Sequence, residues 1–215
     1  RERIKTYYVE HGRHFDVMPD VGDLASAQRL FPEMDIDDAS HMIYHLPGTL
    51  QAGTAQLLRW EAEISQMMSD LNVWSENVPI RNSATGEILS TSEQVRERFQ
   101  RREFTQRLET FWRSRNRDKT ELRLNSLKFE VSFVGELPSL AADFSHVTNL
   151  SLFGNEALNV PDGFLARFSG LRKLEMHNFT LGRIPEALAL IPPLETLTLS
   201  SCGVVMDATG QTTLA

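Results

Sequence analysis

Apolar residues recur at helical spacing through the first half of the chain. Six of them, between residues 50 and 75, are separated by alternating steps of three and four residues, which places them on one side of a helix. These six are Leu57, Trp60, Ile64, Met67, Leu71 and Trp74. The spacing predicts a helix over residues 50–75 whose apolar side packs against a partner helix.

Upstream of this helix, the pattern is clear over only part of the sequence. Asp35 can cap a helix over residues 36–46, and this helix should end before Pro47. Residues 1–30 are mixed and weakly periodic, so we interpret them as a lead-in that is irregular or partly helical. Residues 31–118 as a whole form a predicted helical linker or cap.

A third helix is indicated over residues 92–116. Thr91 and Gln94 match a capping box, in which a hydroxyl at the first position and an amide three residues later satisfy free backbone groups. The apolar residues of this helix are Val95, Phe99, Phe104, Leu108, Phe111 and Trp112. Core packing is expected for the aromatic ones among them.

The second half of the sequence repeats itself. Segments that begin at Leu150, Leu174 and Leu197 align at intervals of 24 and 23 residues, which are leucine-rich-repeat periods. Each such unit forms a short strand with alternate leucines pointing inward, and stacked units share one continuous core. A degenerate first unit at residues 122–127 precedes them by 28 residues. Residues 120–215 are therefore predicted to form leucine-rich repeats that are truncated at the C-terminus.

The predicted fold is α+β, with an N-terminal helical cap followed by a short, incomplete leucine-rich-repeat solenoid with parallel strands. Residues that flank the inward leucines should share one concave face. We expect this face to bind a protein, because Phe153 supplies an apolar anchor beside mixed charges. The alternative is a plain solvated sheet face. The predicted binding residues are Arg123, Asn125, Asn149, Ser151, Phe153, Lys173, Glu175, His177, Thr196, Thr198 and Ser200.

The charge of the chain is acidic overall but uneven. A net charge of −7 argues against non-specific nucleic-acid binding. Residues 95–119 nevertheless hold eight Arg and one Lys against three Glu and one Asp, and such a helix could grip nucleic acid or an acidic membrane. Glutamates interleave with these arginines at ion-pair spacing, as in Glu97 and Arg101, which favours a solvated helix face. No nucleic-acid partner is expected.

Few residues suggest catalysis or metal binding. Cys202 is the only cysteine, and its repeat position, at which Cys or Asn commonly turns the chain, favours a structural role. His41 and His45 are spaced so that both could face one metal ion, but Met42 stands where the metalloprotease motif needs Glu. We expect no catalytic residue, metal or cofactor here. We also expect no transmembrane segment, because no apolar run approaches the roughly 20 residues that span a bilayer.

The repeat region and the helical segment before it resemble one family of bacterial proteins. The runs at residues 137–152, 160–168 and 170–174 resemble the repeats of Pseudomonas-type dermonecrotic-toxin-like proteins, leucine-rich-repeat effectors that end in a novel E3 ligase (NEL) domain. Residues 30–112 resemble the linker that precedes those repeats. The resemblance implies a separate downstream ligase domain that accepts ubiquitin on a Cys-x-Asp cysteine. Cys202 lacks that motif, because Gly and Val follow it.

The resemblance implies a function for a larger parent protein, of which we interpret this chain as a fragment. The chain would be the substrate-binding segment of a secreted effector, a parent E3 ubiquitin-protein ligase that acts in the host cell cytoplasm. Its partner would be a host target protein, and the parent's own ligase domain is a second candidate. Two alternatives stay open. The repeats could be an architectural or binding part of a toxin without ligase activity, or the chain could act through Cys202 or a metal at His41 and His45.

Overall fold

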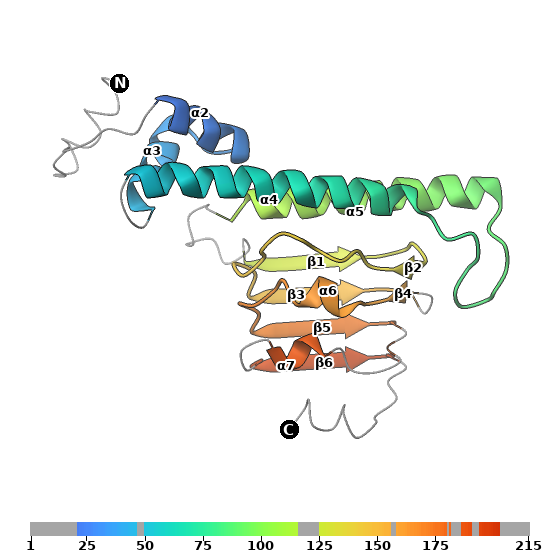
Figure 1. The fold of residues 1–215 in the computed structure, drawn as a ribbon. Coiled ribbons are helices and arrows are strands. Elements are labelled where there is room, and N and C mark those ends of the chain that lie inside the picture. The colour runs from blue at the N-terminus through green and yellow to red at the C-terminus, as the bar shows by residue number, and fades with distance from the viewer. Residues whose placement is uncertain are drawn as a thin grey trace. The chain divides into compact units, whose positions relative to one another are not determined.

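Helices precede a sheet of parallel strands in this chain (Figure 1), so the α+β class is confirmed. The computed structural model describes residues 21–46, 50–115, 125–155, 158–179, 181, 186–190 and 194–202. The chain divides into two compact units. The first comprises Arg1–Ser65 with Arg113–Arg117, and the second comprises Gln66–Trp112 with Asp118–Ala215. None of the described helices is both long enough and apolar enough to cross a membrane.

Helix α2, Val21–Leu30, belongs to the first unit and occupies the last ten residues of the lead-in that was predicted to be irregular or partly helical. Three of its apolar residues, at steps of three, are buried: Leu24, Ala27 and Leu30. One narrow apolar side is enough to hold a helix in a tertiary context, although it is too weak a pattern to identify the helix from the sequence. The rest of that prediction, residues 1–20, lies outside the described residues.

Helix α3, Ile36–His45, begins where the sequence predicted. The Oδ1 atom of Asp35 accepts a hydrogen bond from the backbone N–H of Asp38 at 2.8 Å, which satisfies one of the free donors in the first turn. The helix ends one residue earlier than expected, because Leu46 has left the helical conformation. The backbone N–H of Leu46 still donates to the carbonyl of Ile43.

Helix α4, Leu50–Glu76, confirms the predicted long helix. Four of its six predicted seam residues are buried, namely Leu57, Ile64, Met67 and Leu71. The two tryptophans of the seam are half-buried. In the first unit, Trp60 meets the ring of Phe31 edge to face at 5.7 Å. In the second unit, Trp74 meets Phe133 in the same way at 5.3 Å.

Helix α5, Thr91–Arg113, starts with a capping box that lies one residue before the predicted one. Ser90 takes the first position. Its Oγ accepts from the backbone N–H of Glu93 at 3.3 Å, and its own N–H donates to the Glu93 carboxylate at 2.7 Å. A carboxylate is a stronger acceptor than the amide of Gln94 and also suits the positive end of the helix dipole. The prediction of Thr91 as the cap was therefore wrong.

The buried side of α5 differs from the predicted one in its first half. Phe104, Leu108 and Trp112 are buried as expected, but Val95 is 57% exposed and Phe99 is 61% exposed. The buried stripe continues toward the start of the helix through two charged residues, Glu97 and Arg101, which lie on the opposite side from Val95 and Phe99. The expectation of core packing is therefore wrong for Phe99.

Four parallel strands form the main sheet of the second unit, in the order β1-β3-β5-β6. Their bounds are Ser126–Glu130 for β1, Asn149–Phe153 for β3, Lys173–His177 for β5 and Thr196–Ser200 for β6. The register pairs Leu127 with Leu150, Leu150 with Leu174 and Leu174 with Leu197. The strands that contain Leu150, Leu174 and Leu197 therefore follow one another at the intervals of 24 and 23 residues predicted from the sequence.

The first strand lies five residues beyond its predicted position. The leucine that pairs with Leu150 is Leu127, whereas the sequence alignment placed Leu122 there. Leu122 and Leu124 imitate the spacing of the other strands, but the true strand has Phe129 at its second inward position and is therefore less obviously leucine-rich. Residues 122–124 lie outside the described residues. The longer first interval of the alignment was wrong, because the step from β1 to β3 matches the later steps.

The segments that lead from one strand of the main sheet to the next, called return segments here, contain a second, two-stranded parallel sheet and two short helices among the described residues. Strand β2, Gly135–Glu136, pairs with β4, Leu158–Asn159. Helices α6, Asp162–Leu165, and α7, Ala187–Leu190, follow in later return segments. Between the return segments and the main sheet lies a core of leucine and phenylalanine side chains. Its fully buried rings include Phe129, Phe144, Phe164 and Phe168.

Phe179 departs from the sequence pattern after the strands, and Gly154, which follows the neighbouring strand, makes room for it. Asn155 follows β3 and its Nδ2 donates to the carbonyl of Phe133 at 3.0 Å, but Phe179 stands at the equivalent place after β5. The Phe179 ring is buried, and a Cβ added to Gly154 would lie 2.7 Å from its Cζ. Glycine in one repeat thus makes room for the phenylalanine of the next.

Candidate functional site

Alternate residues of the four strands lie on the face of the main sheet that is not packed against the core. We call this the sheet face. Nine of the eleven residues predicted for binding lie on it: Asn149, Ser151, Phe153, Lys173, Glu175, His177, Thr196, Thr198 and Ser200. Burial alternates along β1, β3 and β5, with the leucines inside and these side chains exposed or half-buried.

The first strand contributes residues that the sequence did not identify. Ser126, Lys128 and Glu130 occupy the sheet face on β1, and all three are exposed. Asn125 lies one residue before β1, where its carbonyl accepts from the backbone of the next repeat, so its predicted place on a strand is wrong. Arg123 lies outside the described residues. A constant interval between repeats is the signal that identifies the missed positions.

Three side chains form a stacked row across the sheet face. The imidazole of His177 stacks on the ring of Phe153 with 4.6 Å between centroids and 3° between planes. The Nζ of Lys128 lies 4.7 Å from the centroid of the same ring. The aromatic ring is therefore held between a cation on β1 and a planar ring on β5. This arrangement fixes the orientation of an apolar group on an otherwise polar face.

The charged groups of the sheet face are paired with one another. The Nζ of Lys173 lies 2.8 Å from Oε1 of Glu175, and the hydroxyl of Ser151 donates to Oε2 of that carboxylate at 2.7 Å. The Nζ of Lys128 lies 3.1 Å from the carboxylate of Glu130. The hydrogen bonds from Lys173 and Ser151 lower the pKa of Glu175. The face thus presents mixed but balanced charge around Phe153.

The lowered pKa of Glu175 gives the fold a pH dependence with a definite sign. A carboxylate whose pKa is lower in the folded than in the unfolded chain stabilises the fold above the unfolded pKa, about 4.3 for Glu. That contribution is lost as the pH falls through the folded pKa. We expect the wild-type protein to lose stability relative to Glu175→Gln in this acidic range. Urea unfolding of both proteins at successive pH values measures the difference. A difference that is constant with pH would contradict the ion-pair geometry.

The arginine-rich helix α5 is exposed at Arg102 and Arg107, as its charge pattern suggested, but these arginines also contact other elements. In the second unit, Arg98 and Arg102 both pair with the carboxylate of Glu76 at the end of α4. Arg107 donates to the backbone carbonyl of Lys128 on β1. These contacts use the arginines to attach α5 to α4 and to the first strand. They are exposed or half-buried, so each contributes modestly to stability.

Two further arginines have structural partners in the first unit. The Nη1 of Arg113 donates to the backbone carbonyl of Leu30 at 2.7 Å. Arg115 is mostly buried and lies 3.4 Å from the carboxylate of Glu63, and its guanidinium is 5.8 Å from the ring centroid of Trp60. Both contacts bring the end of the arginine-rich segment against helices of the same unit. Arg113 and Arg115 are therefore engaged in contacts within the protein.

Arg101 is the most deeply integrated of these arginines, with only 2% of its surface exposed. Its Nη1 donates to the backbone carbonyls of Trp74 and Asn77 and its Nη2 to that of Val134, each at 3.0 Å. The guanidinium also lies 4.7 Å from the ring centroid of Trp74. One side chain thus joins the end of α4, the loop after it and the segment that follows β1.

Glu97, one turn before Arg101, is also buried and holds the same segment. Its Oε2 accepts from the backbone N–H of Val134 at 2.9 Å. Burial raises the pKa of Glu97, while the hydrogen bond from Val134 and the positive charge of Arg101 counteract the rise. Burial lowers the pKa of Arg101, and the charge of Glu97 offsets part of this. The negative charge of Glu97 and the positive charge of Arg101 therefore stabilise each other inside the fold.

Cys202 and the pair of His41 and His45, the residues that the sequence offered for catalysis or metal binding, contact neighbouring groups of the protein. Cys202 is half-buried, and its Sγ lies 3.5 Å from the carbonyl oxygen of Met176 in the preceding repeat, as a turn residue would. His41 and His45 bring their Nε2 atoms to 3.1 Å of each other. Within the described ranges, no group of three or more His, Cys, Asp or Glu residues could hold a metal ion. The described part of the chain therefore adds no third ligand to the histidine pair.

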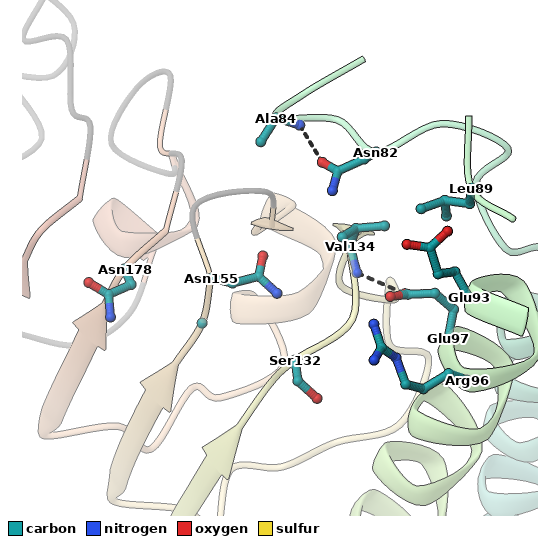
Figure 2. A pocket seen from close by; sticks show the side chains of 11 residues that line it. Asn82, Ala84, Leu89, Glu93, Arg96, Glu97, Ser132, Val134, Asn155 and Asn178 are labelled. Atoms are coloured by element: carbon teal, nitrogen blue, oxygen red, sulfur yellow. Dashed lines mark hydrogen bonds between the residues drawn. The ribbon is translucent and has the colours of Figure 1, made fainter. Parts of the chain in front are cut away.

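A pocket of about 640 Å³ lies where the strands of the main sheet end and α5 begins (Figure 2). Its wall combines residues that follow β1, β3 and β5 with residues from the loop after α4 and from the first turns of α5. The lining residues are Asn82, Ala84, Leu89, Glu93, Arg96, Glu97, Ser132, Val134, Gly154, Asn155 and Asn178. Gly154 directly follows Phe153, and Asn178 directly follows His177, so the pocket adjoins the aromatic end of the sheet face.

Comparisons of this chain with protein-family models, with curated proteins and with solved structures find no match. The functional interpretation therefore rests on the geometry of the sheet face and of the pocket beside it.

Proposed function

We propose that this chain is a protein-recognition segment and that it binds its partner through the sheet face. The observation that carries the proposal is the stacked row of Lys128, Phe153 and His177. An aromatic side chain held in a fixed orientation binds at a lower cost in conformational entropy than a free one. Aromatic anchors surrounded by polar groups are typical of the residues that dominate protein interfaces.

The balanced charges of the sheet face favour a protein partner over a highly charged one. Lys173 with Glu175 and Lys128 with Glu130 leave the described part of the face without a surplus of either sign. A nucleic acid or an anionic membrane needs a net positive surface. Paired side chains also keep their hydrogen bonds when a partner excludes water, so burial of the face leaves few polar groups unsatisfied. Such a face suits a mixed, largely neutral protein surface.

We further propose that the second unit is a capped leucine-rich-repeat solenoid. The nearly constant register offset between neighbouring strands supports this, because stacked repeats of similar length produce such a register. The position of α5 supports the proposal of a cap, because the ring centroids of Phe104 on α5 and Phe129 on β1 are 4.4 Å apart. A helix on the first strand protects an edge that would otherwise pair with other chains.

The larger protein in which this segment acts is proposed from the sequence resemblance to NEL-type effectors. In such a parent, the sheet face would select the target, and a ligase domain elsewhere would modify it with ubiquitin in the host cytoplasm. Cys202 has no place in that chemistry, since its sequence context lacks Cys-x-Asp and its Sγ faces a backbone carbonyl. The proposal assigns recognition to this chain and no catalytic step.

The test compares two phenylalanine substitutions of the same kind. Phe153→Ala removes the anchor of the sheet face, and Phe99→Ala removes an exposed ring from α5. Immobilised wild-type and variant chains are incubated with host-cell extract, and bound proteins are quantified by mass spectrometry. We expect at least one protein that the wild type and Phe99→Ala retain equally and that Phe153→Ala retains about tenfold less, as for removal of a central interface residue.

Stability must be measured alongside binding, because Phe153 also packs against its neighbours. Circular dichroism spectra of the two variants should coincide with that of wild type at the binding temperature. If every protein retained by wild type is retained equally by Phe153→Ala, the sheet face is not the binding surface. The repeats would then be architectural, which is the competing hypothesis for this chain.

A further inference from the structure

Arg96 differs from the other described arginines of the α5 segment. Arg98, Arg101, Arg102, Arg107, Arg113 and Arg115 each contact a carboxylate or a backbone carbonyl. Arg96 makes no hydrogen bond and no ion pair with any described residue, and its side chain is exposed on the wall of the pocket. Its guanidinium is therefore available to a ligand.

A second donor of the pocket, the side-chain amide of Asn82, is oriented by the protein itself. The Oδ1 of Asn82 accepts from the backbone N–H groups of Ala84 and Thr85, at 2.9 and 3.3 Å, which fixes the carboxamide. Its Nδ2 has no partner among the described residues, and Figure 2 shows Asn82 and Arg96 on the pocket wall. Ser132, which follows β1, adds an exposed hydroxyl.

The two carboxylates of the pocket already have hydrogen-bonded partners. Glu93 accepts from the N–H and the hydroxyl of Ser90 at the start of α5, and these hydrogen bonds lower its pKa. Glu97 accepts from the backbone N–H of Val134. Arg96 acts on both carboxylates only through space. Arg96 is then the one charged lining residue that has neither a hydrogen-bonded nor an ion-paired partner in the described part of the chain.

We propose that this pocket binds a carboxylate of the protein that occupies the sheet face, an aspartate or glutamate side chain or the chain end, with Arg96 as its principal contact. The inference rests on the proposed function and adds the chemistry of one contact to it. A guanidinium pairs with a carboxylate through two parallel hydrogen bonds, which a lysine cannot reproduce. Because the pocket adjoins Phe153 and His177, a bound segment can reach it by running past the ends of the strands.

The probe is a random-peptide library displayed on phage, selected on the full chain and then synthesised for affinity measurement. We expect peptides that share an acidic residue. Arg96→Ala should weaken their binding about tenfold, and Arg96→Lys should recover only part of the loss. Replacing the acidic residue in the peptide should have no additional effect in Arg96→Ala. The control is Arg172→Ala, which removes an exposed arginine that is paired with Glu195 and lies outside the pocket lining.

The outcomes separate this inference from the proposed function. Peptides that depend on Phe153 but not on Arg96 would leave the sheet face as the binding surface and overturn the pocket assignment. Peptides that depend on Arg96 but not on Phe153 would support the pocket and contradict recognition by the sheet face. Selection of lysine or arginine whose binding is lost in Glu93→Gln would overturn the assignment as well, because the pocket would then bind a cation. A selection without any Arg96-dependent peptide overturns it too.

Discussion

Replacement of Arg101 by alanine should destabilise the second unit by about 3–5 kcal/mol, the usual cost of removing one partner from a buried, hydrogen-bonded charge network. The substitution removes three hydrogen bonds to the carbonyls of Trp74, Asn77 and Val134. The carbonyl oxygen of Val134 would remain buried without this donor, and those of Trp74 and Asn77 would lose it in a partly buried environment. Glu97 would also lose the nearby positive charge that compensates its own. Urea unfolding followed by circular dichroism measures the change.

Arg102→Ala is the matched control for this prediction. Arg102 is the next residue of the same helix, but its side chain is 60% exposed and pairs with a half-exposed Glu76. Exposed ion pairs contribute from zero to about 1 kcal/mol, so this variant should unfold close to wild type. Equal effects of the two substitutions would show that the position of Arg101 in the core is wrong.

Replacement of Gly170 by alanine should be the most damaging of the glycine substitutions, at about 3 kcal/mol, the upper range for overpacking a filled core. A Cβ at this position would overlap the backbone carbonyl oxygen of Ser145 in the preceding repeat. Backbone cannot move aside as a flexible side chain can. The return segments of two adjacent repeats would have to separate, which would disturb the stacking of Phe144 and Phe168.

Gly53→Ala provides the control of opposite sign. Gly53 lies inside α4, where an added Cβ meets only Leu46 at ordinary contact distance, 3.7 Å. Alanine is favoured over glycine in a helix by about 0.5–1 kcal/mol, so this variant should be slightly more stable than wild type. Thermal unfolding of the two variants compares them directly. A neutral Gly170→Ala would contradict the close approach of the return segments.

The strands that carry the sheet face were predictable to the extent that their leucines were regular. Leu150, Leu174 and Leu197 fixed three strands and nine of the face positions, because alternate residues of a strand must point to opposite sides. The first strand was missed because Phe129 replaces a leucine at its second inward position, and a nearby leucine pair imitates the motif. Equal spacing was a better guide than residue type.

The buried charges of α5 could not be predicted from local sequence. Glu97 and Arg101 have the spacing of an exposed helical ion pair, and nothing in the helix itself distinguishes the two environments. Their burial depends on Val134, a residue far along the chain from the helix, whose backbone they hold from both sides. The prediction that Phe99 packs in the core was wrong for the same reason. Which side of a helix is covered is decided by the elements that it packs against.

The pocket beside the sheet face could likewise not be predicted from the sequence. Its donors come from Asn82 in a loop, Arg96 on a helix and Ser132 after a strand, and no motif links these positions. Only the docking of α5 on the first strand brings them together. The repeat pattern predicted the turn positions after the strands, but it gave them a structural role and no ligand.

Site-specific photo-crosslinking tests the central claim, that the sheet face is the surface that binds a protein, most directly. A benzophenone amino acid is placed at Thr198, on the sheet face of β6, or at Thr110, exposed on α5. Each variant is irradiated in host-cell extract and its covalent products are identified. The account predicts a discrete product from position 198 that disappears when Phe153→Ala is added, and none of the same mass from position 110. A product that forms from position 110 and not from position 198 would contradict it.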